Sequence, residues 1–284
     1  MAGRGRLLVV GTPIGNLGDL TPRAAEALRS ADLVVAEDTR LAARLLAHLG
    51  VRRPTLSYND HSPPARLADL LDRLAGGATL ALTTDAGMPT VSDPGARLVA
   101  AARAAGWEVV VLPGPSAVTA AVAVAGVEAT GFVFGGFLPA RPAGARAGAL
   151  ERLLTAAGMT GLPVVLFEAP HRIGALLASL ERAVPAARVA VCRELTKLHE
   201  EVLVGTPAQV SAAFPEPRGE LTLVISGIQP SAGEAGPLDA ASLVLAAQRA
   251  GLAPRAVVEL LRAAGMPRRE AYRLVHPPTP VSRD

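Results

Sequence analysis

The 284-residue sequence predicts an α/β protein of about two domains, followed by a small helical region. Short β-branched runs alternate with amphipathic helical patterns, and this alternation starts again with different content after Pro113. Hydrophobic residues make up 50% of the chain but aromatic residues only 3%. This composition suits helices packed on sheets, and strands separated by helices imply a largely parallel sheet that is covered on both faces.

The first expected domain comprises residues 1–115. The run "RLLVV" at 6–10 predicts a strand, and Thr21 followed by Pro22 predicts the N-cap and first residue of a helix. The next expected elements are a strand at 32–38, helices at 39–48 and 63–74, a strand at 78–84, a helix at 94–105 and a strand at 108–113.

The second expected domain comprises residues 116–228. Its expected elements are a helix at 116–126, a strand at 131–137, a polar loop at 138–149, a helix at 150–157, a strand at 162–168, a helix from 170 and a strand at 187–194. We expect segments 199–206 and 219–226 to form a hairpin-like antiparallel pair at a sheet edge. Residues 229–284 begin with a Pro-, Gly- and Ser-rich linker and continue as a small tail with helices at 242–251, 254–265 and 268–275.

Composition argues against a membrane or secreted protein. The longest apolar stretch, residues 117–137, is interrupted by Glu128 and is rich in Ala and Gly, so it reads as a buried helix and a strand. The apolar run near the N-terminus ends after four residues, which is too short for a signal sequence. Cys192 is the only cysteine, which excludes an intrachain disulfide. We therefore expect a cytoplasmic protein without a metal site.

The basic character of the chain is carried almost entirely by arginine. The formal net charge is +3, and Lys197 is the only lysine. Genomic base composition explains an excess of Arg, Ala, Gly and Pro, so the basic balance alone does not indicate a nucleic-acid partner.

Four unusual stretches follow predicted strands of the first domain. They are "GTPIGNLGDL", "EDTR", "TDAGMPTVSDPG" and "PGPSA". Because ligands of open α/β sheets bind beyond the carboxyl ends of the strands, we expect these loops to meet at one edge. The first has neither the Lys-Ser/Thr of a P-loop nor a G-x-G-x-x-G spacing, so a dinucleotide or nucleoside triphosphate is disfavoured and a simple tight turn stays open.

The stretch "TDAGMPTVSDPG" predicts a rigid loop that accepts hydrogen bonds. Glycines allow a ligand to approach the backbone, and prolines remove donors while carbonyls and carboxylates stay available. Such a surface suits an amino group, a ribose diol or a sulfonium. For Asp85 we favour a ligand contact, whereas Asp93 followed by Pro94 favours a helix N-cap. "PGPSA" precedes a helix whose N-terminus suits a carboxylate, so a methionine-derived cofactor fits both loops.

These stretches also carry a family resemblance. "VGTPIGNLGDLTPRA", "AEDTR", "TDAGMPTVSDPG", "LPGPSA", "GFLPAR", "FEAPHR", "RELTKLHEE" and "RGELTLVISG", in this order, resemble the motifs of the ribosomal RNA small-subunit methyltransferase I family, in the tetrapyrrole methylase superfamily. The resemblance implies two unlike α/β domains with a cleft between them, a small helical tail and a homodimer. It implies 2'-O-methylation of a cytidine in the decoding centre of 16S rRNA, within the 30S subunit, with S-adenosyl-L-methionine as cofactor.

The resemblance also assigns residues to roles. It implies that the cofactor is bound by Thr84, Asp85, Ala86, Gly87, Pro89, Ser92, Pro113, Gly114, Pro115, Ser116 and Ala117. Further walls are expected from the segments "LFEA" and "GELT". The candidates for RNA contacts are Gly11, Thr12, Pro13, Gly15, Asn16, Arg40, His61, Arg141, Arg146 and Arg172. Taken alone, an arginine in so arginine-rich a chain is more often a solvated surface group, and His61 is more often a loop or cap residue.

The catalytic candidates are Lys197, Glu168 and Glu194. A ribose hydroxyl is a poor nucleophile, and a lysine, unlike an arginine, offers a compact and titratable ammonium. Glu168 and Glu194 either position or deprotonate this lysine, or they are salt-bridge partners of Arg172 and Arg193. Another methylase of the superfamily, acting on a corrinoid or a protein side chain, and a non-catalytic RNA-binding module stay open as alternatives.

Overall fold

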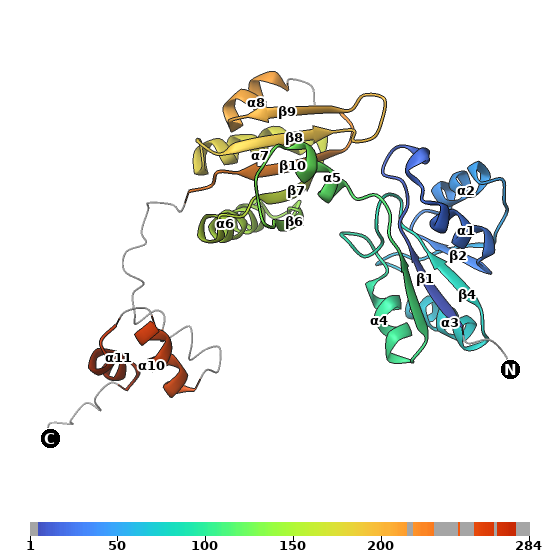
Figure 1. Ribbon diagram of the computed structural model, residues 1–284, viewed down its shortest axis with the longest axis horizontal. Helices are drawn as coiled ribbons and strands as arrows, with labels where there is room; N and C mark the ends of the chain where they lie inside the picture. The colour runs from blue at the N-terminus through green and yellow to red at the C-terminus, as the bar shows by residue number, and fades with distance from the viewer. Residues whose placement is uncertain (1–4, 215–217, 230–243, 245–252, 264–265, 277–284) are drawn as a thin grey trace. The chain divides into compact units, whose positions relative to one another are not determined.

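The computed structural model describes residues 5–214, 218–229, 244, 253–263 and 266–276. The chain divides into two compact units, Met1–Gln229 and Pro230–Asp284. The first unit contains two five-stranded sheets, with β1 to β5 in the first sheet and β6 to β10 in the second (Figure 1). The expected domain divisions at residues 115/116 and 228/229 stay predictions.

The first sheet is entirely parallel and has the strand order β3-β2-β4-β1-β5. Its strands are β1 Arg6–Val10, β2 Leu33–Ala36, β3 Thr55–Ser57, β4 Thr79–Leu82 and β5 Glu108–Leu112. Its helices are η1 Leu17–Asp19, α1 Pro22–Ser30, α2 Thr39–His48, α3 Pro64–Ala75 and α4 Ala96–Ala104. One hydrophobic core joins α1 and α2 to one face of the sheet, and another joins α3 and α4 to the opposite face.

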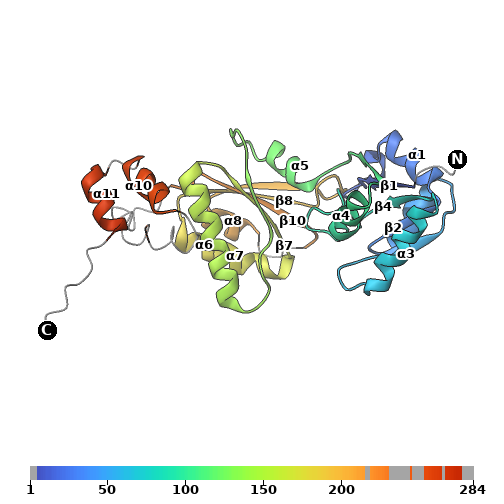
Figure 2. The same ribbon diagram turned by 90° about the horizontal axis from the view of Figure 1, so that it is seen from below.

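The second sheet is mixed and has the order β6-β7-β10-β8-β9. Its strands are β6 Val133–Phe137, β7 Val164–Glu168, β8 Arg188–Arg193, β9 Glu201–Gly205 and β10 Leu221–Ser226. Its helices are α5 Ala117–Val124, α6 Ala143–Thr160, α7 Pro170–Ala183 and α8 Pro207–Ala213. Helices α6, α7 and α8 share a core with one face of the sheet, and α5 packs on the other face (Figure 2).

The second unit contains α10 Pro254–Ala263 and α11 Arg268–Val275. These helices pack on each other through Val257, Leu261, Ala271 and Val275, together with Val244. The helix expected at 242–251 lies outside the described residues apart from Val244, which is helical.

The α/β class and the parallel first sheet are confirmed, but several details of the expected elements are wrong. Strand β3 and helix α8 were not expected, and the expected polar loop at 138–149 becomes helix α6 from Ala143 onward. The segments at 199–206 and 219–226 do not pair with each other, because β9 and β10 lie on opposite sides of β8. Among the described residues, no helix has the length and apolarity needed to cross a membrane.

Gly11 and Gly114 pack backbone against backbone where β1 and β5 end. A Cβ atom on Gly11 would lie 2.6 Å from the Gly114 nitrogen. We expect Gly11→Ala to lower the free energy of unfolding by about 1–3 kcal/mol, because the colliding atoms belong to the backbone and cannot rotate away. Urea unfolding followed by fluorescence of Trp107, the only tryptophan, measures this change.

Gly144 supplies the matched control for this substitution. It lies in the first turn of α6, and a Cβ atom there would meet nothing within 4 Å. Gly144→Ala should leave stability unchanged or raise it by up to ~1 kcal/mol, because alanine favours the helix. Equal stability of the two variants would contradict the close packing at Gly11.

Candidate active site

The loops after β1, β4 and β5 are joined to one another at the carboxyl edge of the first sheet. The backbone amides of Thr12 and Gly87 each donate to the other residue's carbonyl, at 2.9 and 3.1 Å. The Thr12 hydroxyl donates to the Thr84 carbonyl at 3.2 Å, and the Gly11 amide donates to the Leu112 carbonyl at 3.0 Å. Since β4 and β5 both flank β1, these bonds hold three expected ligand loops against one another.

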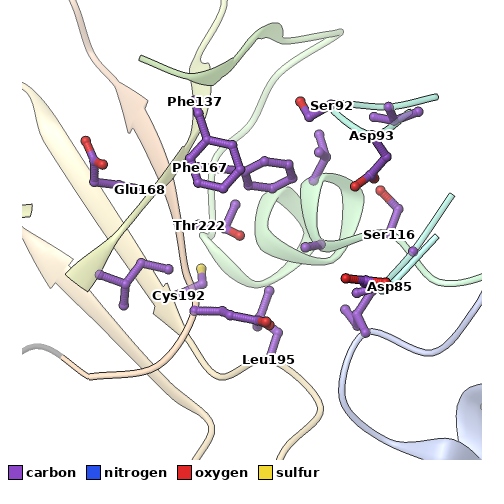
Figure 3. Close-up of a pocket in the computed structure, with 18 of the residues that line it drawn as sticks. Asp85, Ser92, Asp93, Ser116, Phe137, Phe167, Glu168, Cys192, Leu195 and Thr222 are labelled. Atoms are coloured by element: carbon purple, nitrogen blue, oxygen red, sulfur yellow. The ribbon is translucent and has the colours of Figure 1, made fainter. Parts of the chain in front are cut away.

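A pocket of about 430 Å³ lies between these loops and the second sheet. Figure 3 shows Asp85, Asp93 and Ser116 on one side of it and Phe137, Phe167 and Glu168 on the other. The lining residues are Ile14, Glu37, Asp85, Ala86, Gly87, Met88, Val91, Ser92, Asp93, Ser116, Ala117, Val118, Phe137, Phe167, Glu168, Ala169, Pro170, Cys192, Leu195, Gly219, Glu220, Leu221 and Thr222. This volume is in the range of small-molecule sites.

Three carboxylates from the first sheet's loops line one side of this pocket: Glu37, Asp85 and Asp93. Burial raises the pKa of all three, and that of Asp93 rises from 3.8 to about 6. The neighbouring carboxylates raise these pKa values further, because like charges oppose ionisation. A bound cation would offset both the lost hydration and the repulsion between the carboxylates, so this acidic rim suits a positively charged ligand.

The expected helix N-cap at Asp93 is wrong. Helix α4 begins at Ala96, its N-cap is Gly95 with φ 122°, and Asp93 instead lines the pocket. Ser92 has φ 63°, which turns the chain before Asp93, and the Pro94-Gly95 pair then delays the helix. Asp85, for which we favoured a ligand contact, also lines the pocket, and its Oδ1 accepts from the Asp38 amide at 3.1 Å.

An aromatic wall closes the pocket on the side of the second sheet. Phe167 packs against Phe134 and against Phe137, with ring centroids 5.3 Å apart in each pair. Phe137 and Phe167 line the pocket, and Phe137 is 56% exposed. Three of the five phenylalanines of the chain gather here, and the two that line the pocket offer aromatic side chains against which a ring can pack.

Lys197 lies in a tight turn after β8. Its Nζ donates to Glu194 Oε1 at 2.9 Å and to Glu220 Oε2 at 3.0 Å. These two carboxylates raise the pKa of Lys197 despite its partial burial. Lys197 is therefore an ammonium at neutral pH, and this arrangement opposes its use as a general base.

The turn itself is strained and closely packed. Glu194 and Thr196 have positive φ angles of 51° and 67°. A Cβ on Gly219 would lie 2.5 Å from the Glu194 carboxyl carbon, and one on Gly15 would lie 2.4 Å from Lys197 Cγ. Both glycines are therefore needed for Glu194 and Lys197 to occupy their positions.

Glu168 does not contact Lys197. Its buried carboxylate pairs with Arg146 Nη2 at 2.5 Å and with Arg172 Nε at 2.7 Å, and it accepts from the Ala169 amide at 2.8 Å. The sequence left open whether Glu168 acts on Lys197 or pairs with Arg172, and in the structure it pairs with Arg172. Arg193 pairs with Glu201 at 3.1 Å rather than with Glu194.

The structure brings together part of the expected cofactor set. Six of its residues line the pocket: Asp85, Ala86, Gly87, Ser92, Ser116 and Ala117. The other five do not line it: Thr84, Pro89, Pro113, Gly114 and Pro115. Thr84 is buried, and its hydroxyl donates to Glu37 Oε2 at 3.1 Å. The segments 167–169 and 219–222 also line the pocket, within the expected walls.

The expected RNA contacts are more dispersed. Gly11 and Thr12 are buried in the joined loops, Pro13 is half-buried beside them, and Asn16 caps η1 by accepting from the Gly18 amide. Arg40 pairs with Asp38, and His61 and Arg141 are exposed on loops. Arg146 and Arg172 are the only two members of the expected set that meet at one carboxylate in the described part of the chain.

Sequence reasoning missed Glu37 and Phe137 as lining residues, whereas Phe167 and Glu220 lie within the expected walls. Glu37 and Phe137 stand at strand ends within the quoted motifs "AEDTR" and "GFLPAR", so their positions could have indicated them. The described residues contain no group of three His, Cys, Asp or Glu side chains arranged to hold a metal ion.

Solved structures resemble this fold at low sequence identity. Diphthine synthase superposes with a TM-score of 0.62 at 14% identity, covering 78% of this chain and 90% of that one. A cobalt precorrin-4 methyltransferase of cobalamin biosynthesis superposes with a TM-score of 0.57 at 18% identity, covering 77% and 94%. These similarities concern the fold alone.

Sequence comparisons are more specific. Residues 6–211 match the family model of Tetrapyrrole (Corrin/Porphyrin) Methylases. A ribosomal RNA small subunit methyltransferase I from Synechocystis sp. is 44% identical over 231 residues, covering 80% of each chain. One from Thermotoga maritima is 41% identical over 225 residues, covering 78% of this chain and 99% of that one. The chain therefore belongs to the tetrapyrrole methylases and, within them, to the ribosomal RNA small subunit methyltransferase I family.

Proposed function

We propose that this protein transfers a methyl group from S-adenosyl-L-methionine to the ribose 2'-hydroxyl of a cytidine in 16S rRNA, within the small ribosomal subunit. Family membership supports a methyltransferase acting on ribosomal RNA. The observation that carries the proposal is the pocket with three carboxylates along one side and an aromatic wall along the other. A cytoplasmic homodimer is part of the same proposal.

The lining residues fit the parts of this cofactor. When bound, S-adenosylmethionine would supply a methyl group activated by a positively charged sulfur. Asp85 and Asp93 would face its cationic groups, because both carboxylates lose hydration in the pocket and gain most from a positive charge. The phenylalanine wall would pack against its adenine. The first amides of α5, after Ser116, would hold its carboxylate, since no side chain caps this helix.

Lys197 would act on the ribose hydroxyl as a fixed cation. Its ammonium has three N–H groups, two of which donate to Glu194 and Glu220. The third can orient the 2'-oxygen and stabilise the negative charge that grows on it during transfer. Glu194 is itself fixed, because its Oε1 also accepts from the Glu220 amide at 2.8 Å. Glu168 would not act on the hydroxyl, since its carboxylate is already engaged by Arg146, Arg172 and the Ala169 amide.

Methyl transfer tests the proposal directly. Purified protein and radiolabelled S-adenosylmethionine are incubated with small ribosomal subunits, with free 16S rRNA and with a corrinoid precursor. We expect label in the subunits, recovered after alkaline hydrolysis in a cytidine-containing dinucleotide, because a 2'-O-methyl group blocks cleavage of the adjacent phosphodiester. Label only in the corrinoid, or base-labile label in the RNA, would overturn the assignment.

Lys197→Ala tests the role of the ammonium. We expect the single-turnover rate on small subunits to fall about 10²-fold or more, with cofactor affinity within twofold of wild type, because the lost group acts on the hydroxyl. His199→Ala, on an exposed neighbour in the same segment, is the control. Normal turnover by Lys197→Ala would remove Lys197 from the mechanism.

Asp93→Asn tests how much the ionised Asp93 carboxylate destabilises the folded protein. The folded protein holds the pKa of Asp93 near 6, above its ordinary value of 3.8, so its ionised form destabilises the fold above pH 6 and this cost vanishes towards pH 4. Asp93→Asn should therefore raise the thermal midpoint by about 2 °C at pH 8 and by nothing near pH 4. Asp72→Asn, on exposed helix surface, should show no such dependence.

The same variant should bind the cofactor less well. We expect Asp93→Asn to weaken S-adenosylmethionine binding about 5–10-fold in calorimetry at pH 8, because an amide cannot neutralise a cation. S-adenosylhomocysteine, which lacks the sulfonium charge, separates the two cationic groups. A smaller loss for this product locates Asp93 beside the sulfur, and an equal loss locates it beside the amino group. Unchanged affinity for both ligands would contradict the proposed orientation.

A further inference from the structure

Arg146 and Arg172 meet on the buried carboxylate of Glu168 at the rim of the pocket. We propose that these two arginines form a binding site for one backbone phosphodiester of the RNA substrate, and that Glu168 positions them. The inference rests on the proposed function, since it names the group through which the substrate is held.

The role of Glu168 follows from its contacts. Its side chain is fully buried, and its two oxygens receive one guanidinium each and the Ala169 amide. Both oxygens of this carboxylate are engaged by these partners, so neither is directed to a substrate proton. Glu168 therefore fixes the two arginines, one from the first turn of α6 and one from the first turn of α7.

The cluster carries more positive charge than Glu168 can balance. Two guanidinium groups face one carboxylate, and only 18% and 20% of the Arg146 and Arg172 side chains are exposed. Nη1 of Arg146 is buried and has no hydrogen-bond partner in the described part of the chain. Nη1 of Arg172 makes only a long bond, 3.4 Å, to the Leu138 carbonyl. Donors without hydrogen-bond partners in a mostly buried cluster destabilise the folded protein unless an anion accepts hydrogen bonds from them.

The surrounding backbone favours the same kind of ligand. Helices α6 and α7 begin at this cluster after Pro142 and Ala169, and neither helix has a side-chain cap. Arginine in a first helical turn opposes the helix dipole, so helix stability does not explain this placement. An anion bound here would meet two guanidinium groups and the positive ends of two helices.

The position of the cluster selects a phosphodiester rather than the cofactor carboxylate. Glu168 lines the pocket on the side away from Asp85 and Ser116, where we place the cationic groups and the carboxylate of the cofactor (Figure 3). Arg146 and Arg172 do not line the pocket themselves, but they pair with Glu168, which does. Two arginine forks present donors to several oxygens at once, as a phosphate group requires.

Arg146→Gln and Arg172→Gln test the site, with Arg152→Gln and Arg182→Gln as controls on exposed positions of the same two helices. Binding to small ribosomal subunits is measured by filter retention at several potassium chloride concentrations and constant magnesium. We expect each test variant to bind 5–10-fold more weakly than its control, with the slope of log affinity against log salt reduced by about 0.7. Calorimetry should give wild-type affinity for S-adenosylmethionine.

Lysine variants provide a second measurement, because glutamine leaves Glu168 with a single charged partner and can impair folding. Arg146→Lys and Arg172→Lys keep the positive charge beside Glu168 but lose the planar guanidinium, which donates to two oxygens at once. Subunit affinity should therefore fall about 3–10-fold while cofactor affinity is kept. Subunit affinity within twofold of the controls in both series would overturn the proposal. So would a loss of cofactor affinity with subunit affinity intact, which would assign the cluster to the cofactor carboxylate.

Failure of this inference is distinguishable from failure of the proposed function. If the wild-type protein transfers no methyl group to small subunits, the proposed function fails whatever the arginine variants do. If the wild-type protein methylates the subunits and the glutamine and lysine variants bind them normally, only the phosphodiester site is wrong.

Discussion

The close approach of the β1 loop to the loops after β4 and β5 is the constraint on which the site depends. Reciprocal backbone hydrogen bonds join Thr12 to Gly87, and Gly11 lies against Gly114 with no room for a side chain. Because the parallel sheet places β1 between β4 and β5, all three loops leave the same edge and can be fixed to one another. A rigid edge of this kind can hold several carboxylates together in the absence of a ligand, which flexible loops would separate to reduce their repulsion.

The pocket and the arginine cluster beside it carry opposite charges. Asp85 and Asp93 are partly desolvated on the side of the first sheet, where burial raises their pKa values. Glu168, on the other side, is fully buried but surrounded by donors. Ionised Asp85 and Asp93 therefore destabilise the unliganded protein until a cation binds, and the arginine pair on Glu168 carries an excess positive charge that an anion would balance. Binding of a cationic cofactor and of an anionic substrate would therefore each stabilise the folded protein.

Much of this architecture was predictable from sequence because it depends on local patterns. The bounds of α2, 39–48, follow from its amphipathic period, and the strand-end loops follow from their glycines and prolines. The start of α4 was not predictable from sequence, because the Asp-Pro pair resembles a helix cap. Only the positive φ angles of Ser92 and Gly95 direct Asp93 into the pocket. The position of β10 depends on distant partners, although its six buried residues are typical of a central strand. The contacts of Glu168 with Arg146 and Arg172 join three separate elements, so no local pattern reveals them.

Backbone strain shows where this rigidity is concentrated. The four non-glycine residues with positive φ in the described part of the chain are Thr90, Ser92, Glu194 and Thr196. They occupy two segments, 90–92 and 194–196, that each contribute lining residues to the pocket, and each positive φ costs about 1–2 kcal/mol relative to an ordinary conformation. The fold stabilises them with contacts that require glycine, at Gly136 against Ser92 and at Gly219 against Glu194. Since the strain at Glu194 fixes the carboxylate that holds the only lysine, it is best explained by the need to keep one ammonium in one place.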